Sequence, residues 1–258
     1  DILEKILQRK INHFSIPFGT KETYSSKTIN IIASQGFKTN VTTNYDLFKK
    51  NNILNNEARY IWHKETNIDD LDCLVLPGGF SYGDYLRPGA IARFSPVMKE
   101  IINFAKKEKP IIGICNGFQI LCEAKLLPGI LLPNDVLEFR CTTTYLKVQN
   151  SNSIFTNECN KNDILNIPIS HGEGNYFANE DTIKDLEENK RILFKYSSVS
   201  GNITKSANPN GSTNNIAGII NKKGNILGMM PHPERSCEKS LGSEDGNLIF
   251  KSIMNNII

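Results

Sequence analysis

PIIGICNG at residues 110–117 predicts a buried strand that turns sharply into a helix, with Cys115 at the turn. Gly113 and Gly117 stand two residues before and after the cysteine, where a strained turn brings helix and strand too close for side chains. The free N–H groups and the positive dipole end of a helix start favour a thiolate. The stretch therefore predicts a nucleophile elbow that carries sulfur. Taken alone, Cys115 also fits a small apolar residue at the end of a core strand.

The composition is that of a globular protein. The chain has 258 residues, a formal net charge of +3 and 39% hydrophobic residues. It has no stretch of about 20 apolar residues and no signal peptide, so we expect a soluble, cytoplasmic protein that does not bind membranes. Its lysines are scattered, which argues against nucleic-acid binding. Its six cysteines form no C-x-x-C pair, which argues against a zinc ribbon or a disulfide framework.

Strands alternate with helices along most of the chain, which predicts an α/β fold with a mostly parallel sheet. Residues 1–27 are expected to be an extension or linker, and residues 28–258 to form one domain. The second half is richer in turn formers, so we expect an added mixed or antiparallel region there. Besides the elbow, we expect strands at residues 29–33, 58–62, 73–76, 146–148, 167–169, 192–196, 217–220 and 226–230, and helices at 46–50, 90–107 and 245–258.

A thiolate that attacks a carbonyl needs a base, and the base needs a group that orients it. Of the four histidines, His13 lies in the extension and His63 lies among charged residues, where a surface role is expected. The remaining two are His171 and His232. His232 follows an apolar strand, with a proline on each side and Glu234 two residues later. We assign His232 as the base and Glu234 as its orienter, and a surface pair is the alternative.

The loop at residues 77–84 is rich in glycine and follows a buried strand, so it opens at the same sheet edge as the elbow. Its Gly79 N–H and the N–H of Asn116 are expected to stabilise the oxyanion of a tetrahedral intermediate. A simple connector is the competing interpretation of this loop. It is neither a P-loop nor a dinucleotide fingerprint, so we expect no cofactor and no metal in this chain.

Three motifs in this order resemble the class I, triad-type glutamine amidotransferases: PGGF at 77–80, GICNGFQ at 113–119 and PHPE at 231–234. Longer motifs closely resemble the family of glutaminase subunits of phosphoribosylformylglycinamidine synthase, from residue 28 to the end: FSYGDYLR at 80–87, AIAR at 90–93, HGEGNY at 171–176 and GMMPHPER at 228–235. The resemblance implies a flavodoxin-like sandwich with helices on both faces of the sheet.

The resemblance also implies roles for individual residues. Cys115 would form a γ-glutamyl thioester, and His232, backed by Glu234, would protonate the leaving ammonia and then activate water. The amino-acid end of glutamine would be held by Gln119, His171, Gly172, Glu173 and Gly174, for which a polar core network is the alternative. Arg87 and Arg93 would bind a carboxylate or face a partner, or simply lie on the surface.

The family passes ammonia to a separate synthetase subunit for purine synthesis. The implied partners are therefore glutamine, that synthetase and a small accessory subunit, and ATP and Mg²⁺ are expected on the synthetase. The chain departs from the family pattern at residues 33–40, in a lengthened loop at 197–208 and in its first 27 residues. Two rival hypotheses are a thiol hydrolase of the same fold and a catalytically idle scaffold, and the intact Cys115, His232 and Glu234 argue against the scaffold.

Overall fold

The computed structural model describes residues 13–15, 39–41 and 60–256. The chain divides into two units, Asp1–Ile61 and Trp62–Ile258. In the first unit, β1 (His13–Ser15) pairs in parallel with β2 (Thr39–Val41). The domain boundary expected at residues 27 and 28 and the elements expected at 29–33 and 46–50 lie outside the described residues.

The strand expected at residues 58–62 is not present in its described part, since residues 60–62 have no strand conformation. A turn begins there instead. The N–H of Trp62 donates to the Glu65 carboxylate, and the N–H of Glu65 donates back to the carbonyl of Trp62, each at 2.8 Å. These two bonds satisfy backbone groups locally that a strand would have paired with a neighbour.

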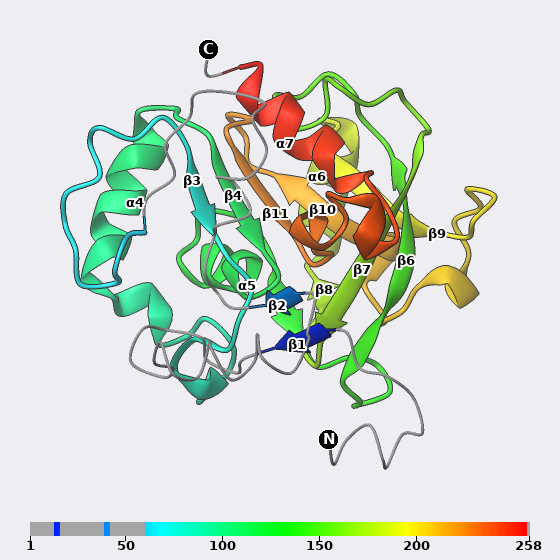
Figure 1. Ribbon diagram of the computed structural model, residues 1–258, viewed down its shortest axis with the longest axis horizontal. Coiled ribbons are helices and arrows are strands. Elements are labelled where there is room, and N and C mark those ends of the chain that lie inside the picture. Colours follow the sequence, from blue (N-terminus) through cyan, green and yellow to red (C-terminus); the bar gives the residue numbers. More distant parts are fainter. Residues whose placement is uncertain (1–12, 16–38, 42–59, 257–258) are drawn as a thin grey trace. The chain divides into compact units, whose positions relative to one another are not determined.

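A seven-stranded sheet forms the centre of the second unit (Figure 1). The α/β class with an added antiparallel region is confirmed. Among the described strands, β3, β4 and β11 run parallel, and the remaining neighbours pair antiparallel. In spatial order the strands are β3 (Leu74–Leu76), β4 (Ile111–Ile114), β11 (Ile226–Met229), β10 (Ile216–Ile220), β9 (Ile192–Ser197), β6 (Arg140–Val148) and β7 (Ile164–His171).

Burial follows the sequence pattern of each strand. Every residue of β4, β10 and β11 is buried, as expected for apolar runs covered on both faces. In β7, buried residues alternate with half-buried ones, so only one face of this edge strand meets the core. The elbow strand therefore lies in the best-covered part of the sheet, which gives Cys115 a rigid base.

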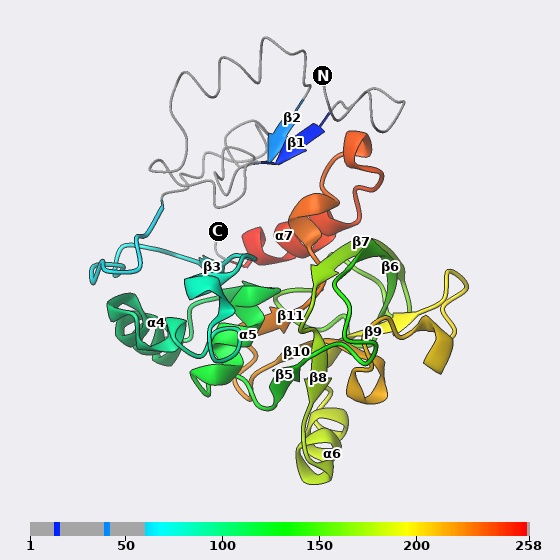
Figure 2. The same ribbon diagram turned by 90° about the horizontal axis from the view of Figure 1, so that it is seen from below.

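In the described part of the chain, four α-helices accompany the sheet: α4 (Pro96–Lys106), α5 (Asn116–Glu123), α6 (Glu180–Glu188) and α7 (Gly246–Met254). Figure 2 shows α7 on one side of the sheet and α5 on the other. The helix expected at 90–107 begins only at Pro96, because proline fits the first helical position and is disfavoured further along. The helix expected at 245–258 is shorter, and α6 was not predicted. No helix among the described residues is long and apolar enough to span a membrane.

Short 3₁₀ segments occupy the connections. They cover Ser81–Asp84, Ala92–Phe94, Lys205–Ala207, Thr213–Asn215, Pro233–Arg235 and Lys239–Leu241. Two of them, at Ser81–Asp84 and Pro233–Arg235, belong to motifs that the sequence analysis assigned to the site.

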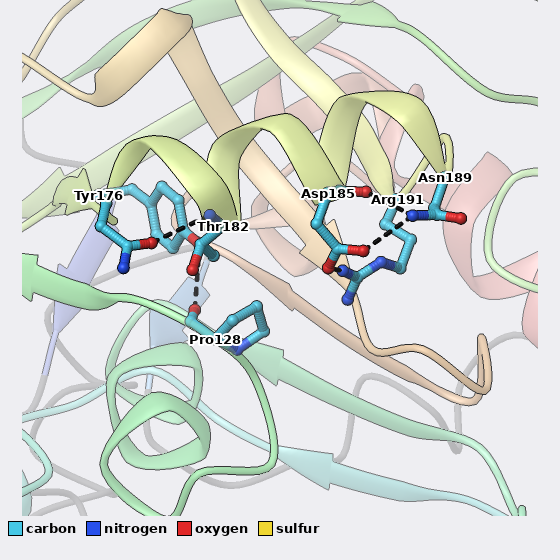
Figure 3. Close-up of polar contacts among 7 residues, drawn as sticks. Pro128, Tyr176, Thr182, Asp185, Asn189 and Arg191 are labelled. Carbon is cyan, nitrogen blue, oxygen red and sulfur yellow. Dashed lines mark hydrogen bonds and ion pairs between the residues drawn. The ribbon is translucent and has the colours of Figure 1, made fainter.

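A small two-stranded sheet packs against α5. It consists of β5 (Ile130–Leu132) and β8 (Asn175–Phe177), which pair antiparallel. Tyr176 in β8 is fully buried, its hydroxyl donates to the carbonyl of Pro128 at 3.0 Å (Figure 3), and its ring stacks on Phe118 of α5. These contacts anchor the end of the loop that follows β7.

Polar contacts also define both ends of α6 (Figure 3). At the start, the side chain of Asn179 accepts from the N–H of Thr182 at 2.9 Å, which satisfies one of the free donors of the first turn. At the end, the buried guanidinium of Arg191 binds Asp185, which also accepts from the amide of Asn189 at 2.8 Å. Helix α6 is thereby fixed although few of its residues reach the core.

Candidate active site

The predicted sharp turn from strand to helix at Cys115 is present. Cys115 joins β4 to α5 with a φ of 51°, a left-handed conformation that is uncommon outside glycine. Its N–H donates to the carbonyl of Met229 at 2.8 Å, so the turn is tied to the neighbouring strand. A Cβ atom on Gly117 would lie 2.0 Å from the carbonyl oxygen of Leu76, and one on Gly113 would lie 2.8 Å from the carbonyl oxygen of Gly117. Helix and strands therefore approach at a distance that only glycine allows.

His232 lies beside this elbow. It follows β11, is 2% exposed, and its Nδ1 atom lies 2.6 Å from the Oε1 atom of Glu234. The Cβ position of Gly78 is 2.7 Å from His232 Cε1 and 3.6 Å from Cys115 Cβ, so the two side chains meet at the same point. The Nε2 atom of His232 is buried and has no hydrogen-bond partner among the described residues. It is therefore free for a proton exchange at the thiol.

The electrostatics of this group favour a charged imidazole. Burial lowers the pKa of His232, but the charge of Glu234 and the interaction with Cys115 outweigh it and raise the pKa above its ordinary value. Burial likewise raises the pKa of Glu234, yet the charge and hydrogen bond of His232 and the charge of Arg235 hold it below its usual range. The pair therefore stabilises the imidazolium that forms when His232 takes up a proton, with the Glu234 carboxylate as its counter-charge.

A cavity of about 170 Å³ opens next to the sulfur. Six of the residues expected from sequence line it, namely Gly79, Cys115, Gln119, His171, Gly172 and Glu173. The thiol donates to the carbonyl of Ser170, with 3.6 Å between sulfur and oxygen. Five residues that the sequence analysis did not assign complete the lining: Phe80, Asp84, Pro88, Phe139 and Ser170. Asn116, Gly174, His232 and Glu234 are not among the lining residues.

The two expected oxyanion donors flank the cysteine. Gly79 lines the cavity and has a φ of 153°, which side chains rarely adopt. Asn116 is the first residue of α5, so its N–H has no partner within the helix. The Asn116 side chain accepts from the N–H of Ser81 at 3.2 Å and donates to Gln119 at 2.9 Å and to Asp84 at 3.4 Å. This amide thus holds the glycine loop against the elbow helix, a role that its sequence position did not reveal.

Gln119 fixes the part of the cavity wall that carries Glu173. Its Nε2 donates to the carbonyl of Glu173 at 2.6 Å while its Oε1 accepts from Asn116, so both ends of the amide are engaged. Burial raises the pKa of the Glu173 carboxyl. Burial and the charge of Glu173 raise the pKa of Asp84 to about 6. No lysine or arginine is among the residues that line the described cavity, so its two carboxylates face a space without a cation.

His171 is part of a buried polar network. Its Nδ1 lies 3.0 Å from Asn134 Oδ1, and its Nε2 lies 3.4 Å from Asn210 Nδ2. Both asparagines also bond the backbone of Gly174, where a Cβ atom would lie 2.2 Å from the His171 ring. Burial and the charge of His232 lower the pKa of His171 to about 4, so it is neutral at pH 7. His171 lines the cavity, yet its ring nitrogens serve the network that was the alternative to substrate contact.

Arg87 of the FSYGDYLR motif and Arg93 of the AIAR motif both bind Glu123 of α5. Arg87 binds Glu123 through two bonds, Nε to Oε1 at 2.6 Å and Nη2 to Oε2 at 2.9 Å. Arg93 contacts the same residue, at 3.8 Å from its carboxylate and 3.3 Å from its carbonyl. A Cβ atom on Gly89 would lie 2.8 Å from the backbone nitrogen of Ile120. These contacts fix residues 87–93 against α5.

His63, which was expected on the surface, forms a hydrogen bond with the hydroxyl of Tyr82 at 2.9 Å.

Comparison with known proteins agrees with this geometry. The family model of the CobB/CobQ-like glutamine amidotransferase domain matches residues 22–246. Phosphoribosylformylglycinamidine synthase subunit PurQ of Salinibacter ruber is 51% identical over 205 residues, which cover 80% of this chain and 87% of that protein. The chain belongs to the PurQ family of glutamine amidotransferases. The PurQ of Moorella thermoacetica is 54% identical over 202 residues, 78% of this chain and 86% of that protein.

Among solved structures, this PurQ-family chain resembles PurLQS from Thermotoga maritima. The TM-score is 0.66 at 34% identity, and the match covers 95% of this chain and 98% of that one. The family inferred from the PGGF, GICNGFQ and PHPE motifs is thereby confirmed, and with it the fold class.

Proposed function

We propose that this chain hydrolyses glutamine at Cys115, with His232 and Glu234 completing a triad, and supplies the ammonia for phosphoribosylformylglycinamidine synthesis. The observation that carries the proposal is the meeting of the elbow cysteine and the Glu234-bound imidazole at Gly78. Membership of the PurQ family supports glutamine as the substrate.

The geometry supports the following sequence of steps. The thiol passes its proton to His232 Nε2, which Glu234 stabilises as imidazolium. The thiolate attacks the side-chain amide carbon of glutamine, and the N–H groups of Gly79 and Asn116 bind the oxyanion. The imidazolium then protonates the leaving nitrogen, and ammonia departs from a γ-glutamyl thioester. Water, deprotonated by His232, attacks the thioester, releases glutamate and returns the thiol.

We propose that the carboxylates of Asp84 and Glu173 bind the α-ammonium group of glutamine. Both line the cavity beside Cys115, where no basic side chain competes with the substrate. Gln119 positions Glu173 through its backbone, and the network around His171 and Gly174 shapes the same wall together with Gly172.

We further propose that the ammonia passes to a separate ATP-dependent synthetase subunit, assisted by a small accessory subunit. The similarity to PurLQS supports an assembly of this kind. ATP and Mg²⁺ are assigned to the synthetase, and no cofactor to this chain. All six cysteines are unpaired, which fits a reducing compartment such as the cytoplasm.

The proposal is tested by replacing Cys115 with alanine in the complex. We expect glutamine-dependent synthesis to be lost and ammonia-dependent synthesis to continue, because the synthetase then receives free ammonia. Loss of both would instead assign Cys115 a structural role. Glutamine hydrolysis at equal rates with and without the synthetase would favour the rival thiol hydrolase.

A further inference from the structure

The hydroxyl group of Tyr82 joins the glycine loop to the residues that precede α4. Its oxygen lies 2.9 Å from the Nδ1 atom of His63 and 3.0 Å from the Oγ atom of Ser95. The rings of Tyr82 and His63 also meet edge to face, with their centroids 5.7 Å apart. Ser95 is buried and stands directly before α4, and the carbonyl of His63 accepts from the N–H of Val97 in that helix at 3.1 Å. One hydroxyl therefore binds two segments that meet at the start of the same helix.

The backbone beside this hydroxyl is strained. Tyr82, Gly83 and Asp84 have φ angles of 55°, 65° and 55°, so three consecutive residues adopt the left-handed conformation. This conformation is costly for a bulky residue such as tyrosine, and it persists only where the surroundings impose it. The N–H of Gly83 donates to the carbonyl of Phe80 at 2.9 Å, a bond that closes the turn from within. The hydroxyl of Tyr82 adds a restraint from outside the turn.

A second restraint on the same loop comes from α5. The side chain of Asn116 accepts from the N–H of Ser81 at 3.2 Å and donates to the Asp84 carboxylate at 3.4 Å. The loop is thus held from the start of α4 and from the start of α5. Gly79 and Asp84 of this loop line the catalytic cavity, whereas Tyr82 is not among the lining residues. An effect of Tyr82 on the reaction would therefore pass through the loop backbone.

We propose that Tyr82 is a positioning residue for glutamine hydrolysis. Its anchored hydroxyl fixes the left-handed turn, which places the Gly79 N–H at the oxyanion and the Asp84 carboxylate at the α-ammonium group of glutamine. The inference rests on the proposed function, which assigns these two roles. The first contact strengthens as charge develops in the transition state, and the second already binds the substrate before it. Loss of the hydroxyl therefore lowers kcat and raises KM together.

The reactivity of the Cys115 thiol serves as an internal reference. Cys115 is tied to the sheet through its own N–H, which donates to the carbonyl of Met229. Iodoacetamide alkylates a thiolate by displacing iodide from a saturated carbon, so this reaction forms no oxyanion. Its rate reports the thiol and the elbow, whereas glutamine hydrolysis also requires the glycine loop.

The test is Tyr82→Phe in the full chain. Tyr82 is 44% exposed, so the variant removes a hydroxyl without leaving a cavity in the core. In complex with the synthetase, we expect kcat/KM for glutamine to fall about tenfold or more, because loss of one oxyanion donor costs about 10²–10³-fold in kcat. Ammonia-dependent synthesis should continue at the parental rate. In the uncomplexed chain, iodoacetamide should alkylate Cys115 at the parental rate, and amide hydrogen exchange at residues 79–84 should be faster.

Two further variants separate the hydroxyl from the rest of the side chain. Tyr85→Phe is the matched control, because Tyr85 belongs to the same motif, is 74% exposed, and has no hydroxyl hydrogen bond to another described residue. Ser95→Ala removes one partner of Tyr82, and α4 keeps its start because the Ser95 side chain does not cap this helix. Ser95→Ala should lower kcat/KM, and adding it to Tyr82→Phe should cause no further loss, because both act on one contact.

Parental kcat/KM in Tyr82→Phe, an equal loss in Tyr85→Phe, or alkylation of Cys115 slowed by the same factor would overturn the proposal. A lower melting temperature with parental kinetics would overturn it as well, and would assign the hydroxyl to stability alone. Hydrogen exchange separates this inference from the proposed function. A parental complex that does not hydrolyse glutamine would reject the proposed function, and parental exchange at residues 79–84 in Tyr82→Phe would reject the anchoring of the loop.

Discussion

The Nδ1 atom of His232 lies 2.6 Å from the Oε1 atom of Glu234, at the end of a fully buried strand. Proline flanks His232 on both sides, and the N–H of His232 donates to the carbonyl of Pro168 at 2.8 Å. The imidazole is therefore held from its backbone and from its ring, with Nε2 left for chemistry.

Glu234→Gln tests the orienting role. We expect kcat for glutamine hydrolysis to fall by about 10³–10⁴-fold, because a neutral amide no longer stabilises the imidazolium. KM is expected to change little, since Glu234 does not line the cavity. Steady-state kinetics provide the measurement, and Arg235→Gln is the control because Arg235 lies 3.8 Å from the same carboxylate. Parental kcat in Glu234→Gln would contradict the orienting role of Glu234.

The same pair makes stability depend on pH. The raised pKa of His232 gives a contribution that is fully present below its unfolded value of 6.5 and is lost as pH rises through the folded value. The lowered pKa of Glu234 gives one that is fully present above its unfolded value of 4.5 and is lost as pH falls. The difference in unfolding free energy between parent and Glu234→Gln should therefore be largest between those two values. Urea titrations across pH measure it, and a pH-independent difference would contradict the ion pair.

A glutamine analogue with a soft electrophile should label Cys115 before the other cysteines. Burial raises the pKa of Cys73, Cys159 and Cys237 to about 12 and also raises that of Cys122, so these thiols are unreactive at neutral pH. Cys141 is exposed and should react first with a simple alkylating agent that lacks the amino-acid group. Peptide mass mapping distinguishes the two patterns, and labelling of Cys141 by both reagents would argue against a substrate site at Cys115.

Asp84→Asn tests recognition of the α-ammonium group. In the parent, KM for glutamine should rise as pH falls below about 6, because protonation of Asp84 removes the charge that binds the substrate. The variant should show a raised KM at pH 8 and little further rise in acid. Asp181→Asn, on the exposed face of α6, is the control and should behave like the parent. A parental KM in Asp84→Asn at pH 8 would remove Asp84 from the site.

Gly117→Ala tests the close approach of α5 to β3. The added methyl group would lie 2.0 Å from the backbone oxygen of Leu76, which cannot move without displacing the sheet. We expect a loss of about 3 kcal/mol or more in unfolding free energy. Gly172→Ala is the matched control, since its nearest neighbour is Phe139 at 3.7 Å, an ordinary contact. Equal stabilities would mean that the elbow relaxes easily.

The sequence predicted those parts of the molecule whose residues have a strong local requirement. The glycines around Cys115 predict a tight turn, and the apolar runs of β4, β10 and β11 predict buried strands, because few other local structures suit these residue patterns. Helix α6 was missed because only Ile183 and Leu186 of its nine residues are buried, which gives too weak a period. Strand β6 starts at Arg140, earlier than expected, because its first half is largely exposed and lacks an apolar pattern.

In the site, the sequence identified the residues of the motifs but not how they share their contacts. Asn134 and Asn210 hold His171 and Gly174 from other loops, and only the folded chain brings them together. The polar PNG stretch at 209–211 was the one available signal for Asn210. Asp84 was overlooked because the sequence analysis assigned a role in the loop at residues 77–84 only to the N–H of Gly79.

The contact of Gly117 with Leu76 means that the reacting sulfur and strand β3, which precedes the glycine loop, move as one block. The position of the Cys115 sulfur relative to the substrate carbon is then set by the spacing between β3 and β4. Peripheral insertions, such as the long turn after β9, can accumulate over generations without disturbing the trajectory of attack.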